Sequence, residues 1–157
     1  MELRRLNLED IQRLPHKSIE VVSTFEENNV NIPGNFVDAS FLNAGGRNPE
    51  AIHDLKRATI ETVANAIKHG NQFDINKKVN VFTTSSNGLF YVAIQDQGLG
   101  FDLDSCRDSA VEKYIPCSIG IHTDILCEGK GIKLITDIMD DVYNFCDNVA
   151  YFSKRIK

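Results

Sequence analysis

One segment of the chain, residues 61–71, reads Glu61-Thr-Val-Ala-Asn65-Ala-Ile-Lys-His69-Gly70-Asn71. Glu61, Asn65 and His69 are spaced by four residues, so on a helix they lie along one face, each about 40° from the last. The apolar residues around them repeat at helical intervals, which predicts a face packed into a core. A carboxylate and a carboxamide beside a core are unfavourable unless something polar is bound there. Such oxygen ligands suit a hydrated magnesium ion, which usually comes with phosphates.

The helix that carries this segment is the element with the clearest predicted boundaries. It is expected to begin at about Pro49 or Glu50, because proline is well suited to the first turn of a helix. It is expected to end at His69, with Gly70 as the residue just after the helix.

The remaining elements are predicted from β-branched runs, apolar periodicity and turn residues. Asn87-Gly88 between two β-rich runs predicts a hairpin of strands 79–84 and 89–95. Residues 32–42 are ambiguous, because Pro33 and Gly34 precede an apolar run that suits a helix of two or three turns. The other predicted elements are a short helix or arm at 1–14, a strand at 18–25, a long loop at 103–128, a helical pattern at 132–142, and strands at 141–146 and 150–156.

Length and composition predict one ordinary globular domain. The chain has 157 residues, 42% hydrophobic and 25% charged, which is enough for one core and too little for two. The net charge is −5, and no run of Lys or Arg exceeds a pair, which argues against a direct nucleic-acid binder. No apolar segment suggests a signal peptide or a membrane span, so we expect a cytoplasmic protein without membrane contact.

The four cysteines do not form a recognisable pattern. No CxxC pair occurs, and we interpret the cysteines as reduced thiols. A zinc site of Cys117, His122 and Cys127 can be drawn, but its spacing matches no standard ligand pattern, and we favour the simpler interpretation. The other two cysteines are Cys106 and Cys146.

Two glycine motifs follow the long helix. The first, Asp96-x-Gly98-x-Gly100, comes directly after a predicted strand, where a buried Asp can accept a hydrogen bond from an exocyclic amine such as that of adenine. The second, Gly129-Lys130-Gly131, opens a predicted helix whose free N–H groups can bind phosphate oxygens. Each motif alone is equally typical of a tight turn or a hinge. Their order, with a long loop between them, is more specific.

Together the three segments resemble the N, G1 and G2 boxes of the GHKL ATPases (gyrase, heat-shock chaperone, histidine kinase, MutL). The wording Asn-Ala-x-x-His-Gly-Asn at residues 65–71 looks most like the anti-sigma-factor serine/threonine kinases of the RsbW and SpoIIAB type. The resemblance extends from about Ser18 to Ile156. A P-loop is absent from the sequence, so this scheme would hold the nucleotide in its place.

The resemblance implies a role for individual residues. It implies that ATP binds with Mg²⁺, that Asn65 coordinates the metal, and that Asp96 bonds the adenine amine. It implies that Glu61 is the general base that accepts the proton of the attacking hydroxyl or water. His69 matches the sequence motif of the family but is given no catalytic role. The residues implied to contact the nucleotide are Asn65, Asp96, Gly98, Gly100, Gly129, Lys130, Gly131 and Ile132.

The fold expected on this basis is an α/β (α+β) two-layer sandwich of the Bergerat ATP-binding type. Its sheet is expected to be mixed and mainly antiparallel, with the helices on one face. Residues 1–157 are expected to form a single domain, with an N-terminal arm at 1–17 and an ATP lid at 103–128. The lid contains bulky aliphatic residues where the family is more polar, and Lys130 stands where the family often has Arg or a small residue.

Three functions remain open from the sequence. The first is an anti-sigma-factor-like kinase that binds a sigma factor and phosphorylates a small, STAS-like antagonist protein, and that forms a homodimer. The second is a nucleotide-dependent binding module without kinase activity. The third is the catalytic domain of a histidine kinase, which we disfavour because the residues before Glu50 leave no room for His-bearing dimerisation helices. A topoisomerase or chaperone fragment is disfavoured because it needs a further domain that supplies a catalytic lysine.

Overall fold

The structure is a computed structural model that describes residues 5–24, 26–98, 134–146 and 148–157. The elements are α1 (Leu8–Arg13), β1 (His16–Val22), α2 (Glu27–Asn43), α3 (Pro49–Asn65), a π-helical turn η1 (Ala66–Gly70), β2 (Lys78–Ser86), β3 (Leu89–Gln95), β4 (Asp141–Cys146) and β5 (Val149–Arg155). Residues 134–138 are also helical. No helix among these described residues is both long and apolar enough to cross a membrane.

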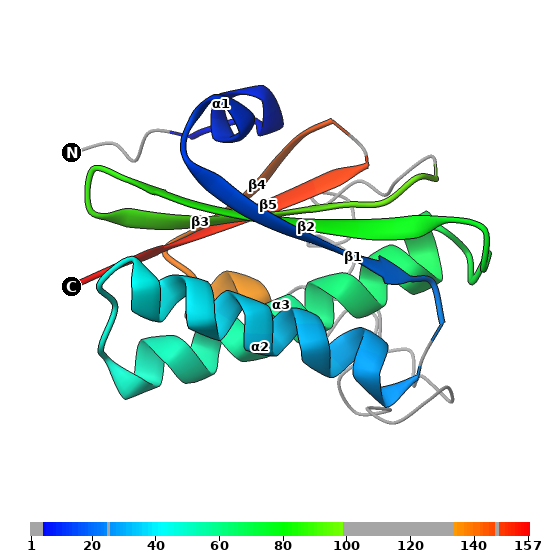
Figure 1. The fold of residues 1–157 in the computed structure, drawn as a ribbon, viewed down its shortest axis with the longest axis horizontal. Coiled ribbons are helices and arrows are strands. Elements are labelled where there is room, and N and C mark those ends of the chain that lie inside the picture. Colours follow the sequence, from blue (N-terminus) through cyan, green and yellow to red (C-terminus); the bar gives the residue numbers. More distant parts are fainter. Residues whose placement is uncertain (1–4, 25, 99–133, 147) are drawn as a thin grey trace.

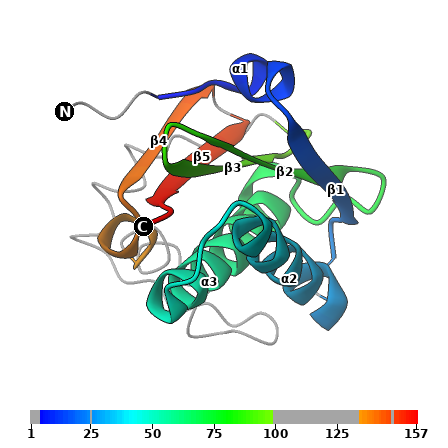
Figure 2. The same ribbon diagram turned by 60° about the vertical axis from the view of Figure 1, so that its left-hand side comes forward.

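The strands form one five-stranded sheet in the order β1-β2-β3-β5-β4 (Figure 1). All four described strand pairs are antiparallel. Helices α2 and α3 lie side by side against one face of the sheet, as both ribbon views show (Figures 1 and 2). The expected α+β sandwich with a mainly antiparallel sheet is therefore confirmed.

The main core fills the space between this helix layer and the sheet. Leu55 and Val63 of α3, Phe41 of α2, and Val92 and Phe152 of the sheet are among its buried members. The periodic apolar face predicted for α3 is the face that packs there. Asn48 caps the helix by accepting a hydrogen bond from Glu50 N at 2.9 Å, and Pro49 occupies the first turn as expected.

The predicted hairpin is present as strands β2 and β3. Asn87 and Gly88 have φ values of 54° and 78°, which suit a two-residue turn of the primed kind. The register pairs Ser86 with Leu89 and Asn80 with Gln95. Strand β3 lies at the centre of the sheet, and Asp96, the residue directly after it, lies beside the helix layer.

Helix α2 begins earlier than the sequence predicts. We expected a strand to continue to residue 25 and left residues 32–42 ambiguous, with a helix of two or three turns as one alternative, whereas the strand ends at Val22 and the helix begins at Glu27. Pro33 lies inside the helix, where it removes one backbone hydrogen bond. The neighbouring Gly34 packs against the side chains of Lys56 and Ile60 of α3, so the tertiary contact between the two helices offsets that loss.

Within the predicted N-terminal arm, residues 5–14 lie on the opposite face of the sheet (Figure 1). Asn7 and Asp10 form a capping box at the start of α1. Leu8 N donates to Tyr151 Oη at 2.9 Å, and Tyr143 Oη donates to Leu6 O at 2.6 Å. A small second cluster, which includes Leu6 and Tyr151, covers this part of the sheet. Helices therefore lie on both faces, although the two long ones share one face.

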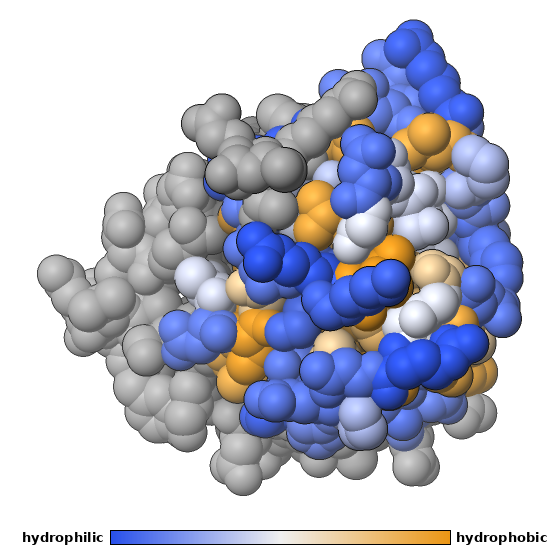
Figure 3. Space-filling view, turned by 90° about the vertical axis from the view of Figure 1, so that its left-hand side faces the viewer, coloured by the Kyte–Doolittle hydropathy of each residue, from blue (hydrophilic) through white to orange (hydrophobic). Residues whose placement is uncertain are grey.

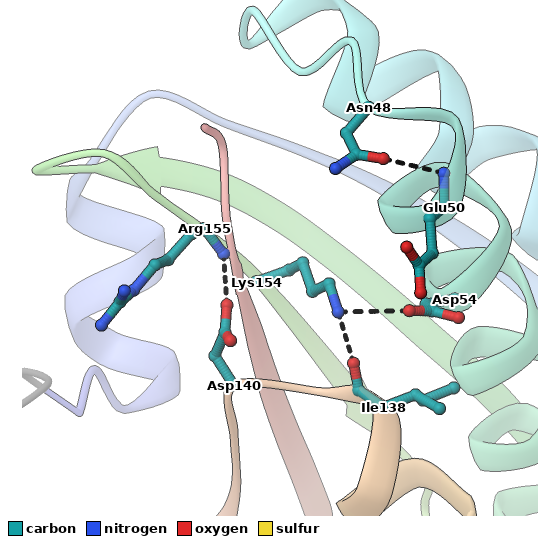
Figure 4. A network of polar contacts seen from close by, with 7 residues as sticks. All are labelled: Asn48, Glu50, Asp54, Ile138, Asp140, Lys154 and Arg155. Atoms are coloured by element: carbon teal, nitrogen blue, oxygen red, sulfur yellow. Dashed lines mark hydrogen bonds and ion pairs between the residues drawn. The ribbon is translucent and has the colours of Figure 1, made fainter.

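Lys154 of β5 joins three elements (Figure 4). Its Nζ lies 3.3 Å from Asp54 Oδ2 of α3 and donates to Ile138 O at the end of the 134–138 helix. The helical pattern was predicted to reach residue 142, but Val142 already pairs with Phe152 in the sheet. The backbone turns at Asp140, whose N donates to Ser153 O and whose carboxylate accepts from Arg155 N.

Candidate functional site

Glu61 is fully buried on α3. Its exposed fraction is 0%, and within the described part of the chain neither carboxylate oxygen has a partner. Burial raises the pKa of Glu61 to about 8, while the positive charge of Arg57, one helical turn earlier, acts in the opposite direction. A buried acid without a partner is unfavourable for folding, so a functional reason for it is the natural inference.

Asn65 lies one turn after Glu61, at the last position of α3. It is 4% exposed, and its Nδ2 has no partner among the described residues. Thr62, between the two, satisfies its own hydroxyl by donating to Ala58 O at 2.7 Å. The helix therefore carries two buried polar side chains one turn apart, and the Glu61 carboxylate oxygens and Asn65 Nδ2 have no hydrogen-bond partner within the described part of the chain.

The helix widens after Asn65 into the π-helical turn η1. Asn71 N donates to Ala66 O at 2.8 Å, a bond that spans five residues instead of four. Of the predicted stripe of three polar residues, Glu61 and Asn65 lie on α3, and His69 lies within the wider turn. Such turns occur often at functional sites, and nothing in the sequence pattern indicated this one.

Asp96 lies at the end of β3, in contact with the end of this turn. It is 2% exposed, and its Oδ1 accepts a hydrogen bond from Gly98 N at 2.9 Å. Burial raises the pKa of Asp96, and the Gly98 hydrogen bond and the charge of Lys77 lower it. A Cβ atom on Gly70 would lie 2.1 Å from Asp96 Oδ2, and one on Gly98 would lie 1.6 Å from Gly70 O. The end of η1 and the segment that follows β3 are thus in contact at two glycines, Gly70 and Gly98.

This contact gives Gly70 a different role from the one predicted. A residue just after a helix is often glycine because it adopts a positive φ. Gly70 is instead the last residue of η1 and is not among the residues with positive φ. Glycine is needed there because the Asp96 carboxylate occupies the space of a side chain.

Replacing Gly70 by alanine is therefore expected to destabilise the protein by about 2–4 kcal/mol, because the new methyl group must displace the end of β3. Urea unfolding followed by circular dichroism measures the change. Gly34→Ala is the control, since its Cβ would meet only flexible side chains at 3.2 Å or more, and we expect a change below about 1 kcal/mol. Equal effects of the two substitutions would contradict the close packing of Gly70 on Asp96.

Asn71 links the same two segments and was not among the predicted site residues. It is 1% exposed, and its Oδ1 accepts from Gln97 N at 2.7 Å. Its Nδ2 donates to Ser23 Oγ at 2.7 Å and to Lys78 O at 3.0 Å. The motif at residues 65–71 contained Asn71, but its partners Gln97 and Ser23 are 26 and 48 residues away in sequence, so spacing alone did not reveal them.

The other predicted site residues lie outside the described part of the chain. These are Gly100, Gly129, Lys130, Gly131, Ile132 and the lid at 103–128. The cysteine-based zinc alternative at Cys117 and Cys127 lies there as well. Within the described residues, no cluster of three or more His, Cys, Asp or Glu side chains could hold a metal ion. The oxygen ligands that the described site offers come from α3 and the end of β3.

The pKa of Glu61 predicts how stability depends on pH. The unfolded carboxyl group ionises near 4.5 and the folded one near 8, so the folded state binds the extra proton between these values. The contribution of this proton to the stability of the folded state is fully present below pH 4.5 and is lost as pH rises through 8. We therefore expect Glu61→Gln to be more stable than the parent protein by roughly 4 kcal/mol at pH 8.5 and nearly equal at pH 4.5. Urea unfolding at both pH values tests this, and a difference independent of pH would contradict it.

A separate cavity of about 210 Å³ lies where β1, β2 and the C-terminal part of α2 meet. Lys17, Asn43 and Thr84 contribute to its walls. None of the predicted site residues lines it, and the described side chains with buried, unsatisfied polar atoms lie elsewhere. The coloured part of the face that carries the α2–α3 connection and the β2–β3 turn is mainly hydrophilic, with separate hydrophobic areas (Figure 3). The buried polar groups of α3 and β3 therefore mark the better candidate site.

Comparison with known families gives a match over most of the chain. Residues 35–149 match the family described as "Histidine kinase-like ATPase domain", a range that includes α3, η1 and the Asp96 turn. The chain belongs to this family of histidine kinase-like ATPase domains, of the GHKL type. Membership implies that it binds ATP.

The curated relatives are named as serine-protein kinases or as anti-sigma factors. The chain is 29% identical over 99 residues to "Serine-protein kinase RsbW" of Listeria monocytogenes serotype 4a (strain HCC23), covering 62% of this chain and 60% of that protein. It is 28% identical over 105 residues to "Anti-sigma F factor" of Bacillus subtilis (strain 168), covering 66% of each. It is 30% identical over 105 residues to "Serine-protein kinase RsbW" of Bacillus cereus (strain AH820), covering 66% of this chain and 62% of that protein. The chain thus spans about 60% of the length of the first of these relatives.

Proposed function

We propose that this protein is an ATP- and Mg²⁺-dependent serine/threonine kinase that acts as an anti-sigma factor. In this proposal it binds a sigma factor and phosphorylates a small antagonist protein, and phosphorylation decides which of the two partners it holds. The observation that carries the proposal is the buried Glu61 carboxyl group, which lies one turn before Asn65 and has no partner among the described residues. The names of the relatives in Listeria and Bacillus support the choice of reaction and partners.

The arrangement of the described residues fits a nucleoside triphosphate. Asp96, at the Gly70 end of the helix, would accept a hydrogen bond from the adenine amine. Glu61 lies nine residues before Gly70, so it is separated from Asp96 along the same helical segment. Asn65 lies between them and would supply an oxygen to Mg²⁺. The remaining residues proposed to line the nucleotide are Gly98, Gly100, Gly129, Lys130, Gly131 and Ile132.

Glu61 would act as the general base. Its carboxylate would accept the proton of a serine or threonine hydroxyl that is aligned with the γ-phosphate. Bound Mg²⁺ would neutralise phosphate charge, and its positive charge would favour the ionised form of Glu61. The buried surroundings of Glu61 would exclude bulk water, so that the hydroxyl of the protein substrate reacts in place of water.

A second function, a nucleotide-dependent binding module without phosphoryl transfer, is favoured by one observation. The pKa of Glu61 near 8 keeps the carboxyl group largely protonated at neutral pH, and a protonated carboxyl group is not a base. The two proposals agree on ATP binding at the same site. They differ only in the fate of the γ-phosphate.

Incubation with Mg²⁺, γ-labelled ATP, and candidate antagonist proteins and sigma factors from the source organism separates the two functions. We expect label on a serine or threonine of one antagonist, and we expect ATP to change which partner is recovered with the protein. ATP-dependent recovery of a partner without any label transfer would favour the binding module. Absence of ATP binding would contradict both functions.

The assembly and location of the protein are further parts of the proposal. We propose a homodimer in the cytoplasm, on the basis of the family resemblance, without direct contact to nucleic acid or membrane. Light scattering coupled to size-exclusion chromatography measures the mass in solution. A monomeric mass at micromolar concentration would contradict the dimer.

A further inference from the structure

Asn71 connects the end of η1 to the strand end that carries Asp96. Its side chain accepts from Gln97 N at 2.7 Å, the first peptide N–H after Asp96. The orientation of the amide follows from its partners, because Gln97 N can only donate and Lys78 O can only accept. The oxygen of Asn71 must therefore face the Asp96–Gln97 peptide bond.

The other bonds of Asn71 fix the side chain in place. Both Nδ2 hydrogens are used, one by Ser23 Oγ at 2.7 Å and one by Lys78 O at 3.0 Å. Ser23 Oγ in turn donates to Lys77 O at 2.8 Å. With an exposed fraction of 1%, Asn71 is a buried junction between η1, the residue after β1, the start of β2 and the end of β3. A side chain bound at three points has little freedom to move.

The position of the Asp96 carboxylate depends on this junction. Gly70, the neighbour of Asn71, lies directly against Asp96 Oδ2, and Gly98 lies against Gly70 O. The Asn71–Gln97 bond is the described side-chain hydrogen bond that holds these two backbones together at this point. If it is lost, the Asp96 turn can shift away from Gly70, and the carboxylate shifts with it.

We propose that Asn71 is a positioning residue that sets the preference of the site for adenine. The residue does not touch the base. It holds the Asp96–Gln97 peptide so that the Asp96 carboxylate meets an exocyclic amine at the six-position of a purine. The inference rests on the proposed function, in which Asp96 bonds the adenine amine.

The test compares the binding of ADP and IDP, which differ at the six-position of the purine, by titration calorimetry with Mg²⁺. Asn71→Ala is expected to raise the Kd for ADP about tenfold and to leave the Kd for IDP within about twofold, because only the amine contact depends on Asp96. Gln97→Pro removes the donor of the same bond from its other side and is expected to give the same loss of preference. Gln97 is exposed, so this second variant carries the test if Asn71→Ala does not fold.

Two matched controls keep the Asn71–Gln97 bond. Ser23→Ala removes one partner of Asn71 Nδ2, and Gln97→Ala removes the side chain that accepts from Lys78 N but retains the backbone N–H. In both variants, the ratio of the Kd for ADP to the Kd for IDP is expected to equal that of the parent protein, even if the variant is less stable. A purely structural role for Asn71 would lower stability without changing this ratio.

The outcomes separate this inference from the proposed function. If a folded Asn71→Ala or Gln97→Pro protein has the same ratio of Kd values for ADP and IDP as the parent protein, the positioning role of Asn71 is overturned. A parent protein that binds neither nucleotide would overturn the proposed function. A parent protein that binds both equally would overturn the adenine contact of Asp96, on which the inference rests. Asp96→Asn, which changes the carboxylate itself, is expected to lose the preference whatever the role of Asn71.

Discussion

Replacing Asn65 by alanine is expected to abolish Mg²⁺-dependent ATP binding. Asn65 lies buried at the end of α3, and its amide is the side-chain group proposed to contact the metal. Mg²⁺ demands near-ideal geometry of its few protein ligands, so we expect affinity to fall at least about 100-fold. Titration calorimetry with ATP, in the presence and absence of Mg²⁺, measures the loss.

Asn35→Ala is the matched control for this substitution. Asn35 lies exposed on α2, so removal of its amide is expected to leave ATP affinity unchanged. Circular dichroism verifies that both variants are folded. Tight Mg²⁺-dependent binding by a folded Asn65→Ala protein would place the metal ligand elsewhere.

Replacing Glu61 by glutamine is expected to separate binding from chemistry. The two side chains have the same shape, and Glu61 is already largely protonated at neutral pH in the absence of ligand, so ATP affinity should stay within about threefold. Glutamine cannot accept the proton of the attacking hydroxyl, and the rate of phosphoryl transfer should fall by about 10²–10⁴. Initial rates of label transfer to the antagonist protein, together with ATP binding, measure both quantities.

Glu50→Gln provides the control on the same helix. Glu50 is exposed in the first turn of α3, and its replacement should change neither binding nor transfer. If Glu61→Gln transfers phosphate at the parental rate, Glu61 is not the base. Loss of ATP binding in this variant would instead give Glu61 a role in holding the nucleotide.

The elements predicted well from sequence are those with local signals. Asn48 and Pro49 mark the start of α3, and Asn87-Gly88 marks the hairpin, because each acts on its own neighbouring backbone. The start of α2 was missed because Pro33 normally interrupts a helix. What permits Pro33 here is the packing of Gly34 on α3, and a contact between two helices is not encoded in the local pattern.

The same distinction applies to the candidate site. Glu61 and Asn65 could be identified because their spacing places them on one helical face. The contact of Gly70 with Asp96 joins residues 26 positions apart, and the sequence shows only that both are present. Asn71 was visible as part of a motif, but its hydrogen bonds to Ser23 and Gln97 depend on the order of the strands in the sheet.

The π-helical turn at Ala66–Gly70 is equivalent to one residue inserted into a regular helix. Every residue after the insertion is rotated by about 100° relative to an uninterrupted α-helix, since each residue advances a helix by that angle. Deleting one residue here would restore regular geometry, but it would turn Gly70 and Asn71 away from the end of β3. The extra residue therefore changes the direction in which the residues after it point around the helix axis. It lets one continuous segment present Glu61 and Asn65 from a regular helix and still meet Asp96 at its end.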